Sequence, residues 1–124
     1  MPKPGLTGIQ RLIDALGYSM KGIKAAWQNE AAFRQEAAMA AILFPAAFWL
    51  ARNVVELCLL EGAVLLVLTV EILNSAIEAI VDKTSPEVHE LAGRAKDMGS
   101  AAVFFAIAAC SFVWLAILYS RFFA

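Results

Sequence analysis

One face of a single predicted helix carries the polar groups best suited to chemistry. The segment 70–82 reads VEILNSAIEAIVD and ends an apolar run, 57–72, that is typical of a helix buried in lipid. At about 100° per residue, four polar side chains fall within an arc of roughly 80°: Glu71, Asn74, Glu78 and Asp82. Carboxylates at the edge of a hydrocarbon layer are costly, so this stripe predicts a functional site.

Other polar residues are expected at the same interface. Glu30 and Glu36 stand at the start of one apolar run, in NEAAFRQE, and Lys96 with Asp97 precedes another, in GRAKDMGSA. Glu78 lies about 10 Å further out along the helix than Glu71, so its carboxylate is expected to be exposed to water. Glu71 is the deeper acid, and its partial desolvation suits a general base.

This pattern favours a site for a divalent cation and a phosphate group. Mg²⁺ binds a few carboxylates together with phosphate oxygens and water, and Glu30 and Glu78 are the best-placed ligands. Lys96 and Arg11 would neutralise phosphate charge. The alternative is that the acids merely form ion pairs that fix helix contacts, with Lys96, Arg94 and Arg34 as partners. The sequence has no P-loop and no GxGxxG, HEXXH or nucleophile-elbow motif, and its single histidine is His89.

Composition places the chain in the membrane class. It has 124 residues, of which 61% are hydrophobic, whereas soluble domains have about 45–50% apolar residues. A net charge of −1 without a basic run gives no case for nucleic acid. We therefore expect one all-α membrane domain covering residues 1–124.

Four helices must position the polar residues. Residues 6–28 predict an amphipathic helix on the membrane surface, with Thr7-x-x-Gln10 as a capping box; packing on a partner protein is the alternative. Three transmembrane helices are expected at 31–51, 54–82 and 97–120. The second is about 42 Å long, so its polar end must protrude from a hydrocarbon layer of about 30 Å.

The basic residues predict an orientation. Five of them precede or enter the first span and three lie between the second and third, whereas Arg52 and Arg121 stand alone on the other side. The positive-inside rule then places the N-terminus and the loop 83–98 in the cytoplasm. The acidic stripe would face the cytoplasmic interface.

Three long strings resemble the prokaryotic integral-membrane diacylglycerol kinases. They are GYSxKGxxAAWxNEAAFRQE at 17–36, VEILNSAIEAxVD at 70–82 and HELxGRAKDMGSAAV at 89–103. The resemblance implies a homotrimer of three-span subunits, each with a surface helix, in the bacterial inner membrane. It also implies transfer of the ATP γ-phosphoryl group to diacylglycerol, which gives phosphatidic acid and requires Mg²⁺.

The resemblance also implies a role for each matching residue. Glu71 would be the base, Asn74 would orient the centre, and Glu30 and Glu78 would hold Mg²⁺. The implied nucleotide contacts, which also include Glu30 and Glu78, are Arg11, Tyr18, Asn29, Glu87, His89, Lys96 and Asp97. The implied lipid-side positions, besides Glu71 itself, are Ser19, Trp27, Phe33, Arg34, Gln35, Glu36, Trp49 and Ser100.

Other functions stay open at this point. A proton-coupled transporter also uses membrane carboxylates, but it predicts a key acid near the bilayer midplane and usually four spans. A kinase for another lipid alcohol, such as undecaprenol, would keep the same site, and a scaffold or holin-like protein would need none of the polar strings. Glu56 and Glu61 belong to no motif; Glu61 should be protonated, hydrogen-bonded across a helix contact, or turned towards Arg52.

Overall fold

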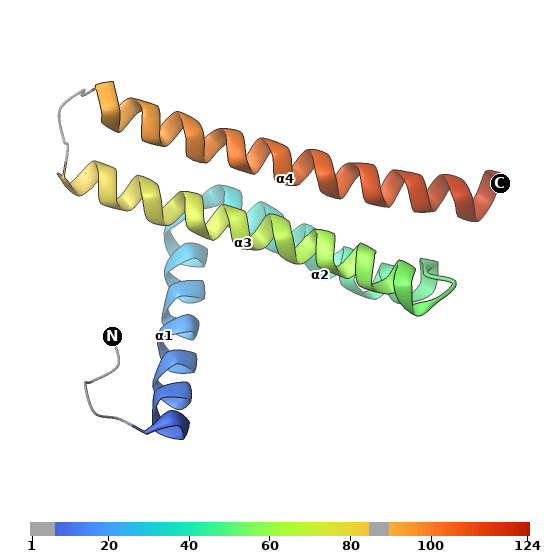
Figure 1. Ribbon diagram of the computed structural model, residues 1–124, viewed down its shortest axis with the longest axis horizontal. Coiled ribbons are helices and arrows are strands. Elements are labelled where there is room, and N and C mark those ends of the chain that lie inside the picture. Colours follow the sequence, from blue (N-terminus) through green and yellow to red (C-terminus); the bar gives the residue numbers. More distant parts are fainter. Residues whose placement is uncertain (1–6, 85–89) are drawn as a thin grey trace.

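The part of the chain that the structure describes folds into four helices. The computed structural model describes residues 7–84 and 90–124, and these contain no β-strand. The helices are α1 (Gly8–Asn29), α2 (Ala31–Leu50), α3 (Val54–Thr84) and α4 (Glu90–Phe123). Figure 1 shows α2, α3 and α4 running alongside one another, with α1 leaving crosswise from the start of α2. The predicted all-α class is confirmed for the described residues.

The start of α1 differs from the sequence prediction. Thr7 is the N-cap residue but makes no side-chain capping bond. Gln10 donates from Nε2 to Oδ1 of Asp14, at 3.0 Å, instead of returning to Thr7. The capping box is therefore wrong, because a carboxylate one turn further along the helix competes for the Gln10 amide.

A single residue turns the chain between α1 and α2. Glu30 has φ −121° and ψ 109°, an extended conformation that ends one helix and begins the next. Its N–H still donates to the Ala26 carbonyl at 2.9 Å. Arg34 reaches back across the turn and donates to the Trp27 carbonyl at 2.8 Å. The turn therefore has a fixed geometry, with Glu30 at its corner.

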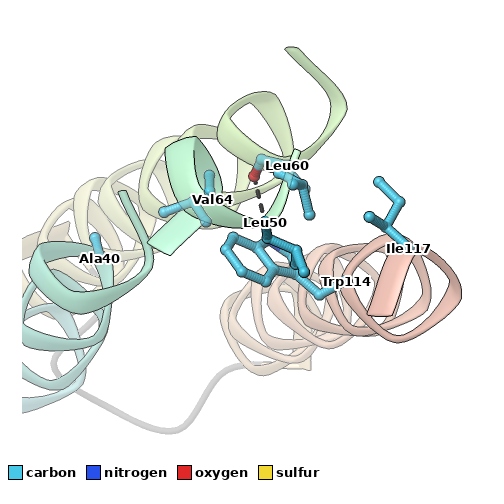
Figure 2. Close-up of a cluster of buried hydrophobic side chains, with 8 residues drawn as sticks. Ala40, Leu50, Leu60, Val64, Trp114 and Ile117 are labelled. Atoms are coloured by element: carbon cyan, nitrogen blue, oxygen red, sulfur yellow. Dashed lines mark hydrogen bonds between the residues drawn. The ribbon is translucent and has the colours of Figure 1, made fainter. Parts of the chain in front are cut away.

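The apolar core lies towards the end of the bundle that is remote from α1. It joins α2, α3 and α4 and contains Ala40, Ala47, Leu50, Leu60, Ala63, Val64, Trp114 and Ile117. Figure 2 shows six of these side chains meeting between the helices, with the Trp114 indole N–H donating to the Leu60 carbonyl at 3.2 Å. This bond satisfies a polar group that would otherwise be buried without a partner.

A polar clamp closes the same end of the bundle. Arg52, in the connection between α2 and α3, donates to Glu56 Oε2 at 2.7 Å and to Ser120 Oγ at 2.7 Å. Its side-chain hydrogen bond to Glu56 raises the pKa of Arg52. Arg52 pairs with Glu56 and not with Glu61, because Glu56 is in the first turn of α3, next to the connection that carries Arg52.

Two of the three expected spans are long and apolar enough to cross a membrane. They are Val54–Thr84 and Glu90–Phe123. The 20-residue α2 is not apolar enough to count as a third such helix, because Arg34, Gln35 and Glu36 lie in its first two turns. The last helix begins at Glu90, seven residues before the predicted span, so that Lys96 and Asp97 lie within α4.

Many large apolar side chains of this small bundle are exposed. Ile9, Leu12, Phe48, Phe105 and Phe112 are all more than 65% exposed. Soluble monomers rarely expose so much apolar surface, which here needs lipid or neighbouring chains to cover it. Together with the two apolar helices, this surface indicates a membrane protein.

Candidate active site

Glu71 is the one charged side chain buried in the described part of the chain. It lies on α3, facing inwards, and is 5% exposed. A buried carboxylate is costly unless a cation or hydrogen-bond donors compensate it. The groups that surround Glu71 therefore decide how its charge is compensated.

Three further carboxylates lie close enough to interact electrostatically with Glu71. They are Glu36 of α2, Glu78 two turns along α3, and Glu30 at the corner between α1 and α2. The extended backbone of Glu30 brings this acid to the cluster, and the bundle packs α2 against α3. We call these four residues the acidic cluster; three elements contribute to it.

The basic residues near the acidic cluster are engaged elsewhere. Lys96 Nζ donates to Asp82 Oδ1 at 3.0 Å. Arg94 pairs with Glu90 at 3.4 Å, and Arg34 donates to the Trp27 carbonyl. Within residues 7–84 and 90–124, no basic side chain forms an ion pair with a member of the cluster. Of the three acids of the stripe on α3, Glu71, Glu78 and Asp82, only Asp82 forms an ion pair with a described residue.

The carboxylates of the acidic cluster fit a hard divalent cation whose other ligands are phosphate oxygens and water. Across the described residues, no three carboxylate, histidine or cysteine side chains lie close enough to hold a metal ion by themselves. Mg²⁺ does not need such a cage, because one or two carboxylates with phosphate oxygens and water complete its shell. Glu30 and Glu78 supply acceptor oxygens of the required kind.

Asn74 connects the cluster to the packing of α3 and α4. Its Nδ2 donates to Glu78 Oε1 at 2.8 Å. Its Oδ1 is buried and has no hydrogen-bond partner among the described residues. Asn74 thus links Glu78 to the interface with α4, and its orienting role stays a prediction.

The residues expected to contact the nucleotide are spread over the molecule. At 1.5 Å per residue, Arg11 lies about 27 Å from Asn29 along α1, and Tyr18 lies about 16 Å from it. Asn29 is exposed, and its Nδ2 donates to the Ala25 carbonyl at 2.8 Å. Lys96 and Asp97 lie on α4, beside the outer end of the α3 stripe. Glu87 and His89 lie outside the described residues.

The expected lipid-side residues divide into two groups. Trp27, Phe33, Arg34, Gln35 and Glu36 gather around the corner between α1 and α2, where Phe33 is 5% exposed. The other positions lie apart from this corner: Ser19 on α1, Ser100 on α4, and Trp49 at the opposite end of α2.

Trp49 is 69% exposed, and its ring centroid lies 6.1 Å from that of Phe122. Along α2 it stands about 20 Å from Glu36. The structure therefore does not bring Trp49 to the acidic cluster, and its role stays a prediction.

An apolar groove leads into the bundle from Glu36. It has a volume of about 460 Å³ and runs between α2, α3 and α4. Glu36 is its one charged lining residue, and its walls include Met39, Leu43, Val67 and Ile107. Sequence reasoning did not find these wall residues, because their spacing is that of any apolar helix and only packing brings the three helices together.

Comparison with known proteins places the chain in a family. The family of prokaryotic diacylglycerol kinases matches residues 17–118. The chain is 53% identical to a diacylglycerol kinase of Escherichia coli (strain K12) over 116 residues, which is 94% of this chain and 95% of that protein. It is 48% identical to one of Pseudomonas aeruginosa over 94% and 95% of the two chains. A third, from Helicobacter pylori, is 41% identical over 90% and 87%. The chain belongs to the prokaryotic diacylglycerol kinase family.

Proposed function

We propose that this chain transfers the γ-phosphoryl group of ATP to the hydroxyl of diacylglycerol, giving phosphatidic acid and ADP. The observation that carries the proposal is the buried Glu71, which has three acids around it and no cationic partner among the described residues. The curated relatives are themselves named diacylglycerol kinases. The predicted site lies where a lipid hydroxyl at the interface meets a nucleotide from the cytoplasm.

In this reaction Glu71 accepts the proton of the lipid hydroxyl. The hydroxyl oxygen then forms a bond to the γ-phosphorus, while the bond from that phosphorus to the ADP oxygen breaks. Glu30 and Glu78 would hold Mg²⁺, which supplies neutralisation of phosphate charge when it is bound. Phosphoryl transfer needs mainly positioning and charge stabilisation, so the protein requires no nucleophile of its own.

The apolar groove supports diacylglycerol as the acceptor. Its walls are apolar along α2, α3 and α4, and its charged end is Glu36, which interacts with Glu71. An acyl chain in the groove would bury apolar surface and leave the glycerol end beside the acidic cluster. A soluble alcohol has no acyl chain to bury in the apolar groove and would gain no binding free energy from it.

We further propose three membrane spans, with α2 as the additional one and α1 on the cytoplasmic surface. The polar first turns of α2 would lie at the interface beside the acidic cluster, and the rest of the helix is apolar. The proline within α2, Pro45, is tolerated in membrane helices because neighbouring helices stabilise them. This topology places the Arg52 clamp on the outer side of the bacterial inner membrane.

The distance of Arg11 from the cluster favours an active site shared between subunits. Because α1 is one continuous helix, Arg11 cannot reach Glu30 of its own chain. A symmetric homotrimer would let the α1 of one subunit complete the site of its neighbour. The test mixes a Glu71→Gln chain with an Arg11→Ala chain by co-refolding. Partial recovery of activity supports sharing, and no recovery in verified mixed trimers contradicts it.

The function itself is tested with γ-labelled ATP and lipid alcohols in mixed micelles. The proposal predicts Mg²⁺-dependent transfer of label to diacylglycerol, with less transfer to undecaprenol. Faster labelling of undecaprenol would assign the other lipid-alcohol kinase activity. Absence of label in every lipid, with a folded chain, would contradict both.

A further inference from the structure

Gly99 of α4 packs directly against the side chain of Asn74 on α3. Gly99 is buried on α4. A Cβ built on it would overlap Oδ1 of Asn74 and lie 3.3 Å from Cγ of the same residue. The other described glycines, Gly8, Gly17, Gly22, Gly62 and Gly93, have open space at that position. Of the described glycines, only Gly99 makes a contact that a Cβ atom would prevent.

This contact determines how the Asn74 carboxamide is oriented. The charged form of Glu78 can only accept hydrogen bonds, so the amide nitrogen must face it, and the observed Nδ2 to Oε1 distance is 2.8 Å. The carbonyl oxygen is thereby directed at α4, where it is buried and has no hydrogen-bond partner in the described part of the chain. The hydrogen that glycine carries in the Cβ direction points at this oxygen, a geometry found at close helix contacts.

The orientation of Asn74 in turn fixes Glu78. Only Oε1 of Glu78 bonds to the amide, and Oε2 makes no hydrogen bond with a described residue. If the carboxamide turned away, Glu78 would lose this hydrogen bond and could adopt other rotamers. The chain of contacts thus runs from Gly99 on α4 through Asn74 to a carboxylate of the acidic cluster.

We propose that Gly99 is a positioning residue for phosphoryl transfer: its missing side chain seats the Asn74 carboxamide and so holds Glu78 with one oxygen free. This inference rests on the proposed function, in which Glu78 binds Mg²⁺. It adds a residue outside the polar stripe and assigns α4 a part in the geometry of the site.

The test compares Gly99→Ala with Gly93→Ala, a matched control on α4 where the new methyl meets open space. We expect Gly99→Ala to lower turnover on the order of tenfold to a hundredfold, the range that follows a misplaced catalytic group. Half-saturation by Mg²⁺ should move to higher concentration, while the KM for diacylglycerol changes little. Gly93→Ala should match the parent chain in all three values.

A second readout does not depend on activity. Mn²⁺ serves as the probe, and its binding to each variant in the presence of a non-hydrolysable ATP analogue is followed by electron paramagnetic resonance. We expect weaker Mn²⁺ binding by Gly99→Ala than by Gly93→Ala. Equal binding and equal kinetics in an active parent chain would overturn the inference and leave the proposed function standing. An inactive parent chain would instead contradict the proposed function.

The double variant shows whether Gly99 acts through Asn74. Asn74→Ala removes the atoms that the new methyl would overlap, so Gly99→Ala should cause no further loss in that background. Additive losses would contradict the proposal. If Gly99→Ala alone fails to fold, recovery of folding in the double variant supports the contact, and failure of that variant too contradicts it.

Discussion

Lys96 of α4 lies 3.0 Å from Asp82 of α3, Nζ to Oδ1, and this ion pair joins the last turn of α3 to the start of α4. Lys96 and Asp82 are both partly exposed, with side chains 42% and 64% accessible. Lys96 therefore forms its ion pair with the outermost acid of the stripe and not with a member of the acidic cluster, although it also lies close enough to interact electrostatically with Glu78. Water and a phosphate group can still reach its ammonium group.

This pair predicts a separation of stability from activity at Lys96. Exposed ion pairs add little to stability, so Lys96→Met should leave the denaturation midpoint nearly unchanged. If Lys96 contacts ATP, the same variant should raise the KM for ATP and lower turnover. The matched control is Asp82→Asn, which breaks the same pair and keeps the lysine. Equal kinetics in the two variants would contradict a nucleotide role for Lys96.

Glu30 and Glu78 should govern the metal dependence. Glu30→Gln and Glu78→Gln each remove one charged ligand and keep the side-chain shape, so half-saturation should move to higher Mg²⁺ with little change in the KM for diacylglycerol. Mg²⁺ titrations of purified variants measure this. If both titrations overlay that of the parent chain, neither residue is a ligand.

Glu61 should be dispensable. Its Oε1 is buried and has no partner among the described residues, and it lies about 15 Å along α3 from Glu71. Glu61→Leu should keep activity and give an equal or higher denaturation midpoint, because a buried polar atom without a partner is removed. A loss of activity as large as that of Glu71→Gln would mean that the site extends deep into the membrane.

The Arg52 clamp should matter for folding alone. Arg52→Met removes the bonds to Glu56 and Ser120, so we expect a fall of a few degrees in the denaturation midpoint with parent-like turnover at low temperature. Arg121→Met is the control, since Arg121 lies over the Phe122 ring at the same end. Equal midpoints in the two variants would show that the clamp contributes nothing.

The helices could be predicted from the sequence because long apolar runs and polar strings mark where they begin and end. The predicted span 31–51 differs from α2 by one residue, and 54–82 from α3 by two. The start of α4 was missed because residues 90–96 are mixed in polarity, although they continue one helix. Hydropathy marks the part of a helix in lipid and not its full length.

The members of the acidic cluster could be predicted as well, but the contacts that link them to other helices could not. Helical periodicity places Glu71, Asn74 and Glu78 on one face, whereas the contact of Asn74 with Gly99 depends on how α4 packs against α3. The pairing of Arg52 with Glu56 likewise depends on the short turn between α2 and α3. The apolar groove arises from three helices, and no single segment carries its pattern.

In the proposed reaction, Glu71 takes the proton of the lipid hydroxyl. The most direct measurement is the turnover of Glu71→Gln with γ-labelled ATP and diacylglycerol in mixed micelles, beside the parent chain and Glu61→Leu. The amide keeps the shape of the side chain but cannot accept the proton, so labelling of phosphatidate should fall by about a hundredfold or more in a folded protein. Glu61→Leu should label at the rate of the parent chain. Near-parent turnover by folded Glu71→Gln would show that Glu71 does not take the proton.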